Sequence, residues 1–101
     1  MLTIQQIKNT VTDYFKDKPV KSVYLFGSYA RGEANEKSDV DLLVKYDDSK
    51  KKLSLFDIVK FKISLEDLFK INVDLVEDGF VYPAIKPYID NDNILILSNA
   101  K

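Results

Sequence analysis

The chain has 101 residues, 46% of them apolar and 31% charged, with a formal net charge of −1. This composition predicts one globular domain over residues 1–101, and the balanced charge gives no basic field, so we expect no direct nucleic-acid binding. The sequence has no cysteine and no histidine, which excludes disulfides, thiolate zinc sites and histidine bases and leaves carboxylates, lysine, hydroxyls or an oxygen-bound hard metal for any catalysis.

The chain begins with a helix. Thr3 and Gln6 have the spacing of a capping box, and Pro19 prevents the helix from continuing far. Between them, apolar residues recur at helical spacing: Ile4, Ile7, Val11 and Phe15. The pattern predicts a helix from Thr3 to about Lys16.

Two strands and a connecting turn follow. The β-branched and aromatic run Val20–Phe26 predicts a strand, and Ser28–Gly32 predicts a short helical turn that Gly32 ends. The polar segment Glu33–Ser38 predicts a loop. Asp39–Tyr46, "DVDLLVKY", predicts a second strand.

The longest helix is predicted from Ser54 to about Lys70, with Ser54 as N-cap and Asp57 in the first turn. Its apolar face is mixed, and we assign to it Leu55, Ile58, Val59, Lys62, Ile63 and Phe69.

The last third of the chain predicts two more strands with a helix between them. Ile71–Glu77 and Asn93–Ser98 are apolar enough for strands, Asp78-Gly79 predicts a turn, and Pro83–Ile89 predicts a short helix. The order predicts an α/β (α+β) fold, a mixed β-sheet of about four strands with helices packed on it.

The sequence contains no signal peptide and no apolar run near the roughly 18–20 residues that span a bilayer. We therefore expect a cytoplasmic protein without a membrane partner.

Two aspartates begin the second predicted strand. Asp39 and Asp41 are two residues apart, so in a strand both side chains lie on one face, and such a pair suits a divalent cation. The spacing itself is common in this chain, because Asp90 and Asp92 repeat it in a polar turn. An equally good alternative is that Asp39 and Asp41 end a strand and face water.

A third acid, Asp74, lies between Val73 and Leu75 in an apolar strand. A carboxylate there is costly unless it is paired or metal-bound, although an edge-strand position facing solvent is an alternative. If this strand pairs beside the second one, three carboxylates converge, which is the ligand set of a two-metal phosphoryl-transfer centre.

Gly27 and Ser28 end the first strand. Glycine lets a backbone approach a ligand closely, and the amides and hydroxyl of such a turn suit a phosphate. Arg31 also suits a phosphate, with a surface ion pair to Glu33 or Glu36 as an equal alternative.

Together these residues resemble a known family. Gly27-Ser28, ten intervening residues and then Asp39-Val40-Asp41 is similar to the signature of the DNA polymerase β-like nucleotidyltransferases. The string "GSYARGEANEKSDVDLLV" resembles the minimal nucleotidyltransferases, the MntA-like antitoxins.

The resemblance implies Mg²⁺-dependent transfer of AMP from ATP. It implies that Asp39, Asp41 and Asp74 are catalytic metal ligands, with Asp74 also activating the acceptor hydroxyl. Gly27 and Ser28 match the residues that hold the triphosphate. We place Arg31 and Ser38, within the same string, among the nucleotide-binding residues.

The resemblance also implies a partner. Minimal members of this group pair with a separate HEPN-domain ribonuclease toxin and attach AMP to one of its tyrosines. A chain this short has little surface for an acceptor, which agrees with an acceptor on another protein. Two alternatives stay open: a small-molecule acceptor of the aminoglycoside type, or an antitoxin that acts by binding alone.

Overall fold

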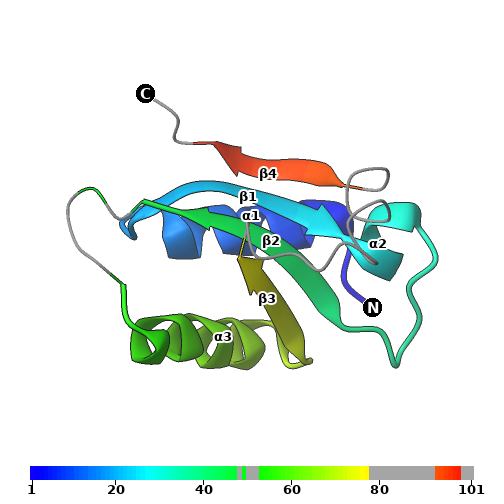
Figure 1. The fold of residues 1–101 in the computed structure, drawn as a ribbon. Coiled ribbons are helices and arrows are strands. Elements are labelled where there is room, and N and C mark those ends of the chain that lie inside the picture. The colour runs from blue at the N-terminus through cyan, green and yellow to red at the C-terminus, as the bar shows by residue number, and fades with distance from the viewer. Residues whose placement is uncertain (48, 50–52, 78–92, 99–101) are drawn as a thin grey trace.

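The computed structural model describes residues 1–47, 49, 53–77 and 93–98, which form a mixed sheet with helices packed on it (Figure 1). The predicted fold class is confirmed. The elements in chain order are α1 (Ile4–Phe15), β1 (Val20–Phe26), α2 (Gly27–Arg31), β2 (Val40–Tyr46), α3 (Leu55–Phe69), β3 (Val73–Glu77) and β4 (Ile94–Ser98).

The strand order in the sheet is β3-β2-β1-β4. β1 is antiparallel to both β2 and β4, whereas β2 and β3 are parallel. Parallel neighbours need a crossover connection, and α3 supplies it between β2 and β3. The third strand therefore lies beside the second, which was the condition for bringing Asp74 near Asp41.

Both long helices begin with a capping box. Thr3 Oγ1 accepts from the Gln6 amide at 3.0 Å, and Gln6 Oε1 accepts from the Thr3 amide at 2.8 Å. Ser54 and Asp57 make the same reciprocal pair at the start of α3. These bonds satisfy amides that a helix start leaves without an intrahelical partner, so both predicted helix starts are confirmed.

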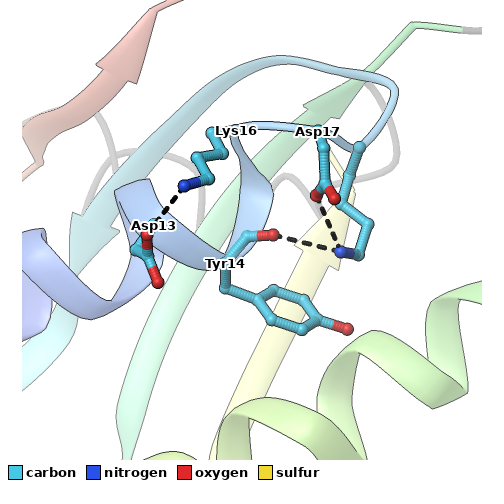
Figure 2. Close-up of polar contacts among 5 residues, drawn as sticks. Asp13, Tyr14, Lys16 and Asp17 are labelled. Carbon is cyan, nitrogen blue, oxygen red and sulfur yellow. Dashed lines mark hydrogen bonds and ion pairs between the residues drawn. The ribbon is translucent and has the colours of Figure 1, made fainter.

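Lysine side chains gather where α1 ends (Figure 2). Lys18 Nζ donates to the Tyr14 carbonyl at 3.2 Å and to Asp17 at 2.9 Å, and it lies 4.3 Å from the centre of the Tyr14 ring. Lys16 and Asp13 form a further ion pair at 3.2 Å. Positive charge near the last carbonyls complements the helix dipole.

The core lies between the sheet and the α1–α3 layer. Alternate residues of β2 face this layer, and an aromatic cluster fills its centre: the Phe15 and Phe61 rings meet edge-on at 5.6 Å, and the Tyr46 ring stacks on Phe61 at 6.2 Å. Burying each such side chain contributes about 1.5–3 kcal/mol. The fully buried residues are Ile7, Val11, Phe15, Val23, Leu25, Val40, Leu42, Val44, Leu65 and Val73.

The predicted core face of α3 was largely wrong. The helix buries Phe61, Leu65 and Phe69, of which only Phe69 had been assigned to the core face. Ile58 is half-buried and packs against this core, as predicted, whereas Lys62 is half-buried and Leu55, Val59 and Ile63 are exposed. α3 is apolar on two faces, and ring contacts from α1 and β2 to Phe61 fix which one turns inward.

Three strands begin one or two residues later than predicted, and β4 is one of them, since it starts at Ile94 rather than Asn93. β3 begins at Val73 rather than Ile71, because Lys70 takes a left-handed conformation (φ 63°) as α3 ends. β2 begins at Val40, so Asp39 directly precedes it. The predicted turn Asp78-Gly79 and helix Pro83–Ile89 lie outside the described residues. None of the described helices combines the length and apolarity needed to cross a bilayer.

Side chains of α3 bind the backbone where β3 begins. Lys62 Nζ donates to the Val73 carbonyl at 2.8 Å, and the Val73 amide donates to Glu66 Oε2 at 3.1 Å. Lys62 and Glu66 are themselves paired at 2.7 Å. The Lys62–Glu66 pair thus gives hydrogen-bond partners to backbone groups of a strand at the sheet edge. Both bonds anchor the backbone at Val73, the residue directly before Asp74.

We expect Glu66→Gln to destabilise the protein at neutral pH but not in acid. The hydrogen bonds from Lys62 and from the Val73 amide lower the pKa of Glu66, so its ionised form stabilises the fold. That contribution is present above the unfolded-state pKa, about 4.3, and is lost as pH falls through the lower folded-state value. Melting curves between pH 2 and 7 should show a lower melting temperature for the variant at pH 7. This difference should begin to shrink below about pH 4 and disappear only below the folded-state pKa of Glu66. A difference that does not change with pH would contradict this, and Asp67→Asn on the exposed face of α3 is the control.

Candidate functional site

Asp41 and Asp74 lie opposite each other on paired strands. Asp41 of β2 is the register partner of Asp74 of β3 in a parallel pair, so their Cα atoms lie roughly 4.8 Å apart and both side chains project from the same sheet face. Val40 and Leu42, the neighbours of Asp41, face the core. The two acids therefore lie on the sheet face opposite α1 and α3.

The two carboxyl groups interact strongly. Burial raises the pKa of Asp41 to about 6, and the charge of Asp74, a hydrogen bond that protonated Asp41 donates to Asp74, and the charge of Asp39 act in the same direction. The positive charge of Arg31 opposes them. Two carboxylates this close repel unless a proton or a cation lies between them, which favours a cation site at this position.

The three predicted acids are not equally close. Asp39 directly precedes β2 and is half-buried. Asp74 is exposed on an edge strand, which agrees with the alternative that this residue faces solvent. Within residues 1–47, 49, 53–77 and 93–98, no three carboxylates are arranged to share one cation. The structure thus brings Asp41 and Asp74 together, and the three-ligand set stays a prediction.

Gly27 lies directly against Asp41. Its φ is +76°, and a Cβ added there would overlap Asp41 Oδ2 and come within 3.0 Å of Asp41 Cγ. The register explains the contact, because Phe26, the last residue of β1, is the partner of Asp41. The sequence predicted a glycine that lets a ligand approach, and the structure adds that the glycine also leaves space for a carboxylate.

Ser28 and Arg31 lie in the short helix that follows. α2 begins with Gly27 and Ser28 and ends with Arg31, whose Nε donates to Glu33 Oε2 at 3.0 Å. Of the two glutamates offered as ion-pair partners by the sequence, the structure selects Glu33. Arg31 is also close enough for its charge to lower the pKa of Asp41, so phosphate binding and the ion pair need not exclude each other.

Ser38 takes part in the turn before β2. Its hydroxyl accepts from the Asn35 amide at 2.9 Å, and its own amide donates to the Asn35 carbonyl at 3.0 Å. Asn35 was not singled out from the sequence. The asparagine-serine spacing is an ordinary turn signal, and here the turn fixes the residue next to Asp39. Nucleotide binding by Ser38 stays a prediction.

The donor set fits a hard cation. Asp41 and Asp74 offer only oxygen atoms, and the described chain has neither histidine nor cysteine. Mg²⁺ typically takes one or two protein carboxylates and completes its shell with water and substrate phosphates. The two paired acids therefore fit this group, with Asp39 adjacent to them in sequence.

Known proteins match the chain over most of its length. The family model described as a nucleotidyltransferase domain matches residues 4–96. A protein of Methanocaldococcus jannaschii with the provisional name protein adenylyltransferase is 41% identical over 101 residues, covering 95% of this chain and all of the relative.

Two solved structures have a similar fold. One, provisionally a minimal nucleotidyltransferase, has a TM-score of 0.73 and 31% identity, covering 90% of each chain. The other is a chain from the structure of a tri-AMPylated Shewanella oneidensis HEPN toxin in complex with MNT antitoxin. It has a TM-score of 0.70 at 20% identity, and the match covers 94% of this chain and 72% of that one. The chain therefore belongs to the nucleotidyltransferase domain family and is an enzyme of its minimal kind.

Proposed function

We propose that this chain is a protein adenylyltransferase that transfers AMP from ATP to a tyrosine hydroxyl of a HEPN-domain toxin, and so acts as an antitoxin. The observation that carries the proposal is the Asp41–Asp74 pair across parallel strands, with Gly27 against it. This arrangement supplies carboxylates beside a turn suited to phosphate, as nucleotide transfer needs.

In the proposed reaction, the acceptor oxygen forms a bond to the α-phosphorus of ATP. The bond from that phosphorus to the bridging oxygen of the β-phosphate breaks, and pyrophosphate leaves. Mg²⁺ held by Asp41 and Asp74, with Asp39, would stabilise negative charge on the phosphates. Asp74 is exposed, so an acceptor hydroxyl from another molecule can approach it and give up its proton there.

The phosphate side of the site would be formed by α2 and its flanks. Gly27 and Ser28 begin the helix at the end of β1, and Arg31 ends it close to Asp41. In the proposal, Ser28 and the amides of the turn bind the triphosphate, and Arg31 compensates its charge. Ser38 would contribute from the turn before β2.

The acceptor is assigned from the relatives. One bears the name of a protein adenylyltransferase, and one structure of this fold holds an AMPylated HEPN toxin.

The test uses the full chain and a HEPN-domain toxin from the same organism as the candidate acceptor. The two are incubated with ATP and Mg²⁺, and the HEPN protein is weighed intact by mass spectrometry. We expect a mass gain of one or more AMP units, located on tyrosine by peptide sequencing, and no gain when the chain carries Asp41→Asn.

Other outcomes would replace the proposal. An unchanged HEPN mass with loss of toxicity in the mixture would indicate neutralisation by binding alone. Label from ATP found on a small molecule, with the HEPN protein unmodified, would assign the enzyme to the small-molecule class.

A further inference from the structure

We propose that Glu33 is a positioning residue that holds the Arg31 guanidinium beside the paired acids, where Arg31 contacts the nucleotide phosphates. The inference rests on the proposed function and assigns a role to a residue that the nucleotide itself does not touch. The contact that carries it is the hydrogen-bonded ion pair of Arg31 Nε with Glu33 Oε2, at 3.0 Å.

The backbone of Glu33 is fixed to α2. The Glu33 amide donates to the Ser28 carbonyl at 2.9 Å, and the Gly32 amide donates to the Tyr29 carbonyl at 3.3 Å. These two bonds, with Gly32 left-handed at φ 73°, form a Schellman motif. The glutamate is thereby held at a defined place relative to Ser28, at the other end of the same short helix.

The charge of the Arg31 guanidinium also reaches the acid pair. α2 starts at Gly27, against the Asp41 carboxyl, and the charge of Arg31 acts on Asp41 across the short helix. An arginine side chain has many rotamers, and a hydrogen bond to a carboxylate whose backbone is anchored favours those that keep the guanidinium at that place. Glu33 thus orders the cation before the nucleotide arrives.

Stability does not explain the pair. The Arg31 and Glu33 side chains are 37% and 66% exposed, and exposed ion pairs contribute little to folding. Removing the Glu33 charge should therefore leave the fold intact and change nucleotide binding instead.

The experiment compares Glu33→Gln, Arg31→Ala and the double variant of the full chain in the AMP-transfer assay. We expect Glu33→Gln to raise the KM for ATP about three- to fivefold with little change in kcat, the size of effect that a partly exposed ion pair transmits. Because Glu33 acts through Arg31, adding Glu33→Gln to Arg31→Ala should change nothing further.

Glu36→Gln is the matched control, since it removes the same charge from an exposed position of the same loop. The inference is overturned if Glu36→Gln raises KM equally, or if Glu33→Gln has its full effect in the Arg31→Ala background. If the wild-type chain transfers no AMP, the proposed function fails, and calorimetric titration with ATP decides the inference separately: Glu33→Gln must weaken ATP binding three- to fivefold, and unchanged affinity overturns it.

Discussion

Replacing Asp41 with asparagine should reduce AMP transfer by about 100- to 1,000-fold, the range for removing one group that stabilises charge in a transition state. Asn keeps the size of the side chain but removes the carboxylate that faces Asp74 across the parallel strands. The measurement is the rate of AMP incorporation into the HEPN protein at saturating ATP and Mg²⁺. Asp39→Asn and Asp74→Asn should also lose transfer if all three acids bind the metal.

The same variant should be at least as stable as wild type. Burial and Asp74 raise the pKa of Asp41 to about 6, so at pH 7 its ionised form opposes folding, and Asn removes that penalty. Without Mg²⁺, the melting temperature at pH 7 should be equal to or above that of wild type. Lost activity with a lower melting temperature would indicate misfolding, and retained activity would reject the site.

Asp13→Asn is the control for this pair of measurements. Asp13 is an exposed aspartate on α1, on the other side of the sheet, where it pairs with Lys16 at 3.2 Å (Figure 2). The variant makes the same aspartate-to-asparagine change at a position remote from Asp41 and Asp74. Transfer by this variant should match wild type.

The strands, the capping box at Thr3 and the N-cap at Ser54 could be predicted because their signals are local. Thr3 with Gln6 and Ser54 with the first turn of α3 lie within four residues of each other, and backbone geometry alone gives them their roles. The proximity of Asp74 to Asp41 needed one further assumption, that the third strand pairs with the second, which parallel pairing across α3 satisfies.

The core face of α3 could not be predicted because the helix is apolar on two sides. Which side is buried depends on Phe15 and Tyr46, which are distant in sequence and meet Phe61 only in the folded chain. The choice of Glu33 over Glu36 as partner of Arg31 also depends on how α2 ends, through the left-handed Gly32. Sequence spacing permits either glutamate.

The contact of Gly27 with Asp41 is a third feature beyond the sequence pattern. Glycine before a helix has several explanations, and only the register of β1 with β2 places the Asp41 carboxyl against it. This contact makes the glycine part of the acid site as well as of the phosphate turn.

Gly27→Ala should therefore lose both stability and transfer. Alanine at φ +76° costs about 1–2 kcal/mol of folding free energy. In addition, its Cβ would overlap Asp41 Oδ2, so the carboxylate must move. A displacement of about 1 Å in a catalytic group lowers rates by about 100-fold, and we expect a loss of that size in AMP transfer.

Gly32→Ala separates the two effects. Gly32 has nearly the same backbone angle, φ +73°, but an added Cβ there meets no atom within 4 Å. It should lose the same 1–2 kcal/mol or so, measured by urea unfolding, and keep most of its transfer activity at a temperature where both variants are folded. If the two variants lose activity equally, backbone strain explains the loss and the contact with Asp41 does not. If Gly27→Ala alone is inactive, the space that Gly27 leaves for the Asp41 carboxyl is needed for transfer.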